Sequence, residues 1–194
     1  TASAVVGQVI HLLAGAAVGL VFLPEGLPES YLPLIRGAWL ALPLVLVFLY
    51  PPLLNRLLAL AARLGGRQAV SCPLKTGHLL AWFILNVAVW LAYGACFYYF
   101  ILSVLPDSDV GFAAATGAYA VGYIIGFLVV FAPGGLGVRE LMFAGLLASA
   151  LGGQGPATVV ALASRVWLSL AELVPLALVL AAGGLPSAAR NKKP

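Results

Sequence analysis

Residues 131–140 read FAPGGLGVRE, and this stretch places a backbone break and two charges inside a very apolar chain. Of the 194 residues, 63% are hydrophobic and 8% are charged, and the mean hydropathy is +1.09. A soluble domain could not keep that much apolar surface away from water, so the sequence predicts an all-α membrane protein. At membrane depth an unpaired backbone amide costs several kcal/mol, so a non-helical break there must face protein or water.

The break is built from residues that do not continue a helix. It contains one proline and three glycines, namely Pro133, Gly134, Gly135 and Gly137. Proline lacks a backbone N–H donor, and glycine adopts dihedral angles that other residues avoid. We expect a helix to restart at about Val138, with its free N–H groups directed back toward the break. Such a helix start is an anion site made of backbone, and Arg139 stands beside it.

The expected fold is polytopic, with about six transmembrane segments and a broken or re-entrant helix pair at the Pro-Gly-Gly sequence. The segments cover approximately residues 4–23, 34–54, 78–105, 110–132, 138–151 and 156–182. The fifth holds about 14 residues, or ~21 Å of helix, which is less than the ~30 Å hydrocarbon core. Three arrangements stay open: a re-entrant helix pair, a break inside the membrane, or a tight turn at the membrane surface.

The loops between these segments divide by charge. Basic residues lie between the second and third segments and in a basic tail at 184–194, whereas acidic residues lie in the loops of the other side. The basic set is Arg56, Arg63, Arg67, Lys75, Arg190, Lys192 and Lys193, and the acidic set is Glu25, Glu29, Asp107 and Asp109. By the positive-inside rule the basic side is cytoplasmic, so we expect both ends of the chain in the cytoplasm.

The sixth segment carries two charges, Arg165 and Glu172, seven residues apart and therefore on one helical face. A charge at the membrane centre costs at least about 2.5–3.5 kcal/mol on insertion scales. One interpretation is structural, with Glu172 paired to Arg139 and Arg165 bonded to backbone carbonyls. The other is a polar path for a lipid headgroup, since arginines and an exposed helix start suit a phosphate. Glu140 could likewise cap the fifth helix or contact the ligand, while Arg139 is the better ligand candidate.

Other polar residues lie within the apolar segments. Gln8, His11, Asn86 and Thr116 are expected to make interhelical hydrogen bonds, and Tyr119 and Tyr123 to pack or to line a cavity before the break. Cys72 and Cys96 are expected to be free thiols. The sequence shows no catalytic set, no metal-ligand spacing, no nucleotide-binding motif and no nucleic-acid footprint. We therefore expect no enzymatic activity of this chain alone and no cofactor.

The stretch from Pro133 to Glu140 resembles the signature of the lysylphosphatidylglycerol synthase transmembrane family, which includes the flippase portion of the bacterial multiple peptide resistance factor. The resemblance is most specific over residues 131–141, extends over 110–182, and is weaker ahead of that. Family members usually carry further helices on the N-terminal side. We therefore expect residues 1–194 to form a single flippase-like domain that is the C-terminal part of a longer family domain.

The resemblance implies movement of a lipid between leaflets. On that basis the three glycines of the break let the backbone approach the headgroup, and Arg139 and Arg165 neutralise its phosphate. Glu140 and Glu172 would contact a cationic aminoacyl group or orient the arginines. The implied substrate is a phosphate-bearing or aminoacylated lipid of a bacterial or archaeal cytoplasmic membrane.

Two other functions remain open from the sequence. The chain could be a non-catalytic, lipid-binding membrane scaffold, or the membrane subunit of a lipid-modifying synthase whose catalytic domain is a separate chain. The expected partners are accordingly membrane lipids, with a second copy of this chain or a synthase chain as further possibilities.

Overall fold

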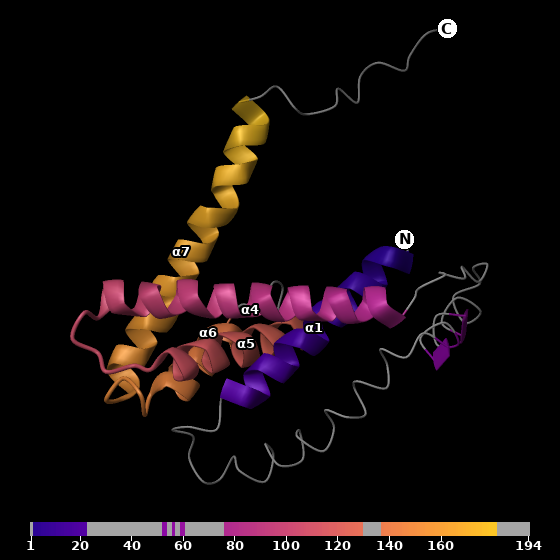
Figure 1. The fold of residues 1–194 in the computed structure, drawn as a ribbon. Helices are drawn as coiled ribbons and strands as arrows, with labels where there is room; N and C mark the ends of the chain where they lie inside the picture. The colour runs from indigo at the N-terminus through magenta and orange to yellow at the C-terminus, as the bar shows by residue number, and fades with distance from the viewer. Residues whose placement is uncertain are drawn as a thin grey trace, which may run out of the picture.

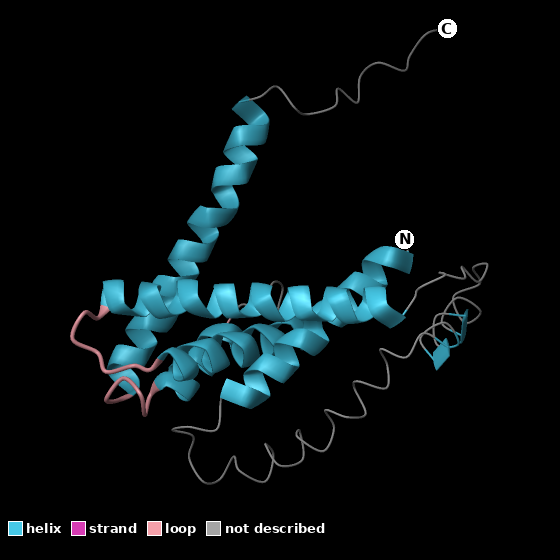
Figure 2. Ribbon diagram, in the orientation of Figure 1, coloured by secondary structure: helices cyan, strands magenta, loops and turns pink. Residues whose placement is uncertain are grey.

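The computed structural model describes residues 2–22, 52–53, 56, 59–60, 76–129 and 137–181, with backbone alone for residues 2–5, Glu172 and Leu176. Every regular element within these ranges is a helix (Figure 2). The expected second segment lies outside them apart from residues 52–53. Pro133, Gly134, Gly135 and the basic tail at 184–194 also lie outside the described residues.

Five helices make up the described fold (Figure 1). They are α1 (Ala2–Phe22), α4 (Thr76–Val104), α5 (Phe112–Leu128), α6 (Val138–Leu147) and α7 (Gln154–Ala181). Each coincides with an apolar segment of the sequence, and α6 begins at the expected residue. The helix α6 has 10 residues, fewer than expected, because the chain turns after Leu147. Its length of ~15 Å is about half of a hydrocarbon core.

Two helices, α4 with 29 residues and α7 with 28, are long and apolar enough to cross a membrane. The helices α1 and α5 are shorter and also apolar. Large apolar side chains on α4 and α7 point away from the bundle; they include Leu80, Ile84, Leu85, Leu170, Leu173 and Leu178. Such surfaces suit contact with lipid acyl chains.

The helices α1, α4 and α5 pack on one another. The helix α6 packs on α5 with one side and on α7 with the other. Small residues let the helices approach closely. At Gly94 of α4, an added Cβ would lie 2.7 Å from the Cβ of Thr116 on α5. At Gly122 of α5, it would lie 2.6 Å from Cδ1 of Phe143 on α6. Glycine is therefore required at both crossings for the observed packing.

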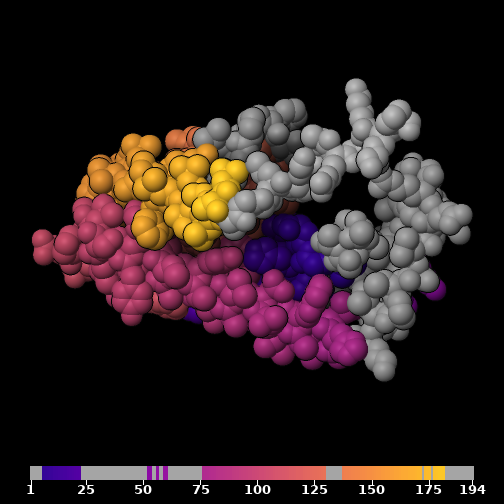
Figure 3. All heavy atoms as spheres, turned by 90° about the horizontal axis from the view of Figure 1, so that it is seen from above, coloured from indigo at the N-terminus to yellow at the C-terminus, as the bar shows by residue number. Residues whose placement is uncertain are grey.

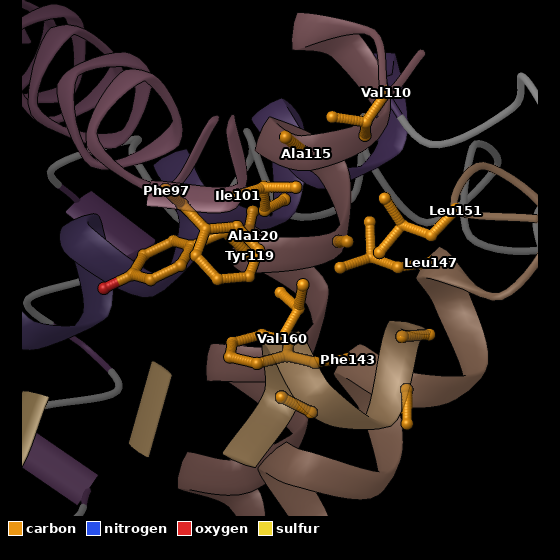
Figure 4. Close-up of a cluster of buried hydrophobic side chains, with 14 of the residues drawn as sticks. Phe97, Ile101, Val110, Ala115, Tyr119, Ala120, Phe143, Leu147, Leu151 and Val160 are labelled. Carbon is orange, nitrogen blue, oxygen red and sulfur yellow. The ribbon is translucent and has the colours of Figure 1, made fainter. Parts of the chain in front are cut away.

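The core lies where α4, α5, α6 and α7 meet. Phe97, Tyr119 and Phe143 lie next to one another in this cluster (Figure 4), with ring centroids 4.9 Å apart for Phe97 and Phe143. Val160 of α7 and Leu147 of α6 belong to the same buried cluster. These side chains fix α6 against α5, and α6 begins with the charged residues of interest.

The helix α7 is buried only along its first half. Ala157, Val160, Ala161 and Ser164 are buried, whereas the described side chains from Leu170 onward are exposed. Figure 1 shows α7 crossing α4 steeply and then projecting away from the other helices. Seen from above, α4 and α7 lie along the same face of the molecule (Figure 3). Arg165 therefore sits where α7 leaves the bundle.

Candidate functional site

The start of α6 is shaped by Gly137 and Glu140. Gly137 has φ of 82° and ψ of −44°, a conformation that glycine adopts with little strain. Its N–H donates a hydrogen bond of 2.8 Å to Oε2 of Glu140, three residues on. This contact is the reciprocal half of a capping box and satisfies one backbone donor at the helix start. Glu140 therefore has the capping role considered from the sequence.

The second carboxylate oxygen of Glu140 faces α7. Its Oε1 lies 3.7 Å from Nε of Arg165, and the side chains are 15% and 33% exposed, respectively. This ion pair joins α6 to α7 and differs from the structural pairing considered above, in which Arg165 met backbone carbonyls. Glu172 lies two turns further along α7, and its side chain is outside the described residues.

Arg139 projects from α6 over a group of aromatic rings. Its Cζ atom lies 4.8 Å from the ring centroid of Tyr123 and 5.8 Å from those of Tyr119 and Phe143. These distances permit cation–π attraction. The Nε atom of Arg139 is buried and has no hydrogen-bond partner among the described residues. The guanidinium is thus held in place by rings that do not neutralise its charge.

A polar and aromatic network extends from this cage toward α1. The ring of Tyr123 lies 5.4 Å from that of Trp90, which stacks on His11 at 4.8 Å. Nε1 of Trp90 donates to the carbonyl of His11 at 2.8 Å, and Nδ1 of His11 lies 2.9 Å from Oδ1 of Asn86. Because Nδ2 of Asn86 donates to the carbonyl of Trp82, Oδ1 is the acceptor and Nδ1 of His11 carries the hydrogen.

The expectation of interhelical hydrogen bonds is confirmed for His11 and Asn86, which join α1 to α4. It is wrong for Thr116, whose buried Oγ1 has no hydrogen-bond partner within the described part of the chain. Thr116 packs directly on Gly94, which has no side chain to accept or donate. Gln8 is exposed.

Four of the residues singled out from the sequence come together around the first turn of α6: Gly137, Arg139, Glu140 and Arg165. Sequence reasoning missed Phe143 as part of the cage around Arg139, although its spacing of one helical turn from Arg139 could have indicated it. The direct pairing of Glu140 with Arg165 was also missed, and no pattern in the sequence indicates it.

The arrangement is suited to binding an anion. Two guanidinium groups and one carboxylate lie near the positive end of α6, so the site carries a net positive charge. Within the described ranges, no group of three or more His, Cys, Asp or Glu side chains could hold a metal ion.

Comparisons with known proteins place the chain in a family. No curated protein sequence and no solved structure matches it. The family model described as "Lysylphosphatidylglycerol synthase TM region" matches residues 1–185, so the resemblance extends well ahead of residue 110, where the motif alone indicated it only weakly. With its long apolar helices, the chain is an all-helical, polytopic membrane protein that belongs to the lysylphosphatidylglycerol synthase transmembrane family.

Proposed function

We propose that the chain translocates a phosphate-bearing or aminoacylated lipid between the leaflets of a bacterial or archaeal cytoplasmic membrane. The observation that carries this proposal is the guanidinium of Arg139, held over three aromatic rings with a buried and unpartnered Nε among the described residues. Arg165 lies on the adjoining helix, paired with Glu140.

The energetics favour an anionic ligand at Arg139. An arginine at the membrane centre costs about 2.5–3.5 kcal/mol on insertion scales, and Arg139 is partly buried with its Nε fully so. A desolvated cation–π contact stabilises the cation by about 2 kcal/mol. The dipole of α6 acts against a cation at this end of the helix. A bound phosphate would make the position of Arg139 energetically favourable, because it accepts charge-assisted hydrogen bonds from the guanidinium and from backbone N–H groups.

The remaining site residues have assigned roles in this proposal. Gly137, together with Pro133, Gly134 and Gly135, lets the backbone approach the headgroup, and Arg139 and Arg165 contact its phosphate. In this proposal Glu140 orients Arg165, and Glu172 contacts a cationic group of an aminoacylated headgroup. The short helix α6 is consistent with a break at membrane depth. The proposed chain has about six transmembrane segments, and both of its termini are cytoplasmic. We propose that this movement is passive or driven by a gradient.

The family description favours one alternative, because it names a synthase. In that alternative the chain is a non-catalytic membrane subunit or scaffold that binds the lipid for a separate catalytic chain. The proposal in either form is that the chain by itself is not an enzyme.

Reconstitution separates these functions. Vesicles of phosphatidylcholine and phosphatidylglycerol would contain the protein and a fluorescent phosphatidylglycerol, and a membrane-impermeant reductant would report the outer-leaflet fraction over time. Wild-type protein should accelerate exchange, and Arg139→Ala should return it to background. Arg56→Ala is the matched control, since Arg56 is exposed and lies outside the site, and it should behave as wild type.

A background rate for the wild-type protein would overturn translocation. A lipid-binding scaffold would then still bind phosphatidylglycerol in an Arg139-dependent manner. The synthase-subunit alternative requires product that forms only after a second chain is added.

A further inference from the structure

A cavity of about 170 Å³ opens between α4, α5 and α7 next to the arginine site. Five of its eight lining side chains are aromatic, and α4 supplies four of the eight at helical spacing: Tyr93, Cys96, Phe97 and Phe100. Trp167 of α7 closes it against Phe100, with ring centroids 6.3 Å apart. The cavity exists because α7 crosses α4 over a short region and then leaves it (Figure 1).

The cavity and the cage around Arg139 share a wall. Tyr119 lines the cavity, and its ring lies 5.8 Å from Cζ of Arg139. On α7, the lining residue Ser164 directly precedes Arg165, and the lining residue Leu168 follows Arg165 by one helical turn. A molecule whose charged end contacts the arginines would therefore have an apolar chamber directly beside it.

We infer that this cavity binds a hydrocarbon chain of the lipid whose anionic headgroup lies at Arg139 and Arg165. The inference rests on the proposed headgroup site and adds that the site selects a complete lipid over a free phosphate compound. A cavity of about 150 Å³ with apolar walls takes up a benzene-sized molecule, so this one holds a short run of a chain.

The described walls of the cavity disfavour a cationic occupant. Among the described side chains, no carboxylate lines the cavity, and the charged groups at the adjoining site are the two arginines and Glu140, which is already paired. A cation would meet net repulsion in a medium where charges interact strongly. A hydrocarbon chain needs no polar partner, and Cys96 and Trp167 are both exposed, so it can enter from the bilayer.

Chain binding should depend on the headgroup. Bulk lipid is as apolar as the cavity, so moving a chain from one to the other gains little from the hydrophobic effect. Occupancy of the cavity must come from packing of the chain against the rings and from its covalent link to the headgroup. This link keeps the chain at high local concentration once the phosphate is bound. A lipid with the same chains and no phosphate should therefore not be retained.

Photo-cross-linking tests this dependence on the wild-type protein in nanodiscs of phosphatidylcholine. One probe is phosphatidylglycerol with a diazirine in its acyl chain, and the other is diacylglycerol with the same chain. We expect the first probe to label the residues around Cys96 and Trp167 about tenfold more than the second, a ratio that corresponds to about 1.4 kcal/mol. Both should label the exposed end of α7 around Leu178 equally. Equal labelling of the cavity by the two probes would overturn the inference.

Filling the cavity gives a second test. Cys96→Phe should reduce labelling at Trp167 about tenfold, whereas Ala88→Phe, on an exposed position two turns earlier in α4, should leave it unchanged. Unchanged labelling in a Cys96→Phe protein that unfolds like wild type would also overturn the inference.

If labelling follows the expectation while lipid exchange stays at background, translocation fails and the chain site stands. If exchange is observed without preferential labelling, the chain site alone fails.

Discussion

Replacing Gly122 by alanine tests how tightly α5 holds the helix that carries Arg139. The new Cβ would lie 2.6 Å from Cδ1 of Phe143, where unstrained carbon atoms lie about 3.5–4.0 Å apart. The ring of Phe143 is 1% exposed and packs on Phe97 and Tyr119, so it has no free space to move into. The helix α6 must therefore shift by about 1 Å.

The expected loss of stability is the difference between two effects. Overpacking a core costs about 1–3 kcal/mol, while alanine gains about 1 kcal/mol over glycine inside a helix. We therefore expect Gly122→Ala to lower the free energy of unfolding by about 1 kcal/mol, with an upper value of about 2 kcal/mol. Arg139 moves with α6, so lipid exchange should also slow.

Gly145→Ala is the matched control, because Gly145 lies in α6 and its added Cβ meets nothing within 4 Å. It should raise the free energy of unfolding by up to about 1 kcal/mol. The assay is equilibrium unfolding of the detergent-solubilised protein in increasing dodecyl sulfate. In the Phe143→Leu background the overpacking should disappear, so Gly122→Ala should become stabilising by up to about 1 kcal/mol, which corresponds to a coupling energy of about 2 kcal/mol. The reasoning fails if Gly122→Ala is as stable as Gly145→Ala, or if Phe143→Leu leaves its cost unchanged.

The same unfolding assay checks three further expectations. Gly137→Ala should cost about 1–2 kcal/mol because φ of 82° is unfavourable for a residue with a Cβ, and a neutral result would contradict that backbone conformation. Glu140→Gln keeps an acceptor for the Gly137 N–H and should cost less than about 1 kcal/mol, since Arg165 is one-third exposed. Glu140→Ala loses the cap as well and should cost about 1 kcal/mol more; equal values would show that the cap contributes nothing. Trp90→Phe removes the donor to the His11 carbonyl and should cost about 0.6–1.7 kcal/mol, whereas Trp82→Phe, at an exposed ring, should stay within about 0.5 kcal/mol. Similar losses for the two tryptophan variants would refute a stabilising role for that hydrogen bond.

The positions of the helices were predictable because the lipid environment leaves few alternatives. Long apolar runs without charge form helices in a membrane, and proline, glycine and acidic turns end them. The start of α6 at Val138 followed from Gly137, which breaks the preceding pattern and adopts positive φ. The end of α6 was less predictable, since the residues after Leu147 are as apolar as those before it.

The contacts within the site were harder to predict from the sequence than the residues that form it. Arg139, Glu140 and Arg165 were each indicated by the cost of charge in an apolar chain. Which carboxylate meets Arg165 depends on the turn between α6 and α7, where Gly152 and Gly153 have φ of 74° and 144°. A helical repeat places Glu172 on the same face of α7 as Arg165, yet it does not determine which neighbouring helix that face contacts. The cavity beside Tyr119 depends on the crossing of α7 over α4, which the sequence does not encode locally.

The use of the two oxygens of Glu140 decides which arginine is left for a ligand. Oε2 accepts the hydrogen bond of Gly137 N–H, and Oε1 faces Nε of Arg165. Neither oxygen of Glu140, nor any other carboxylate in the described ranges, lies within ion-pair distance of Arg139. Aromatic rings attract a cation without cancelling its charge, so they leave its field available to an incoming anion. Arg139, rather than Arg165, is for this reason the residue whose replacement should abolish binding of the headgroup.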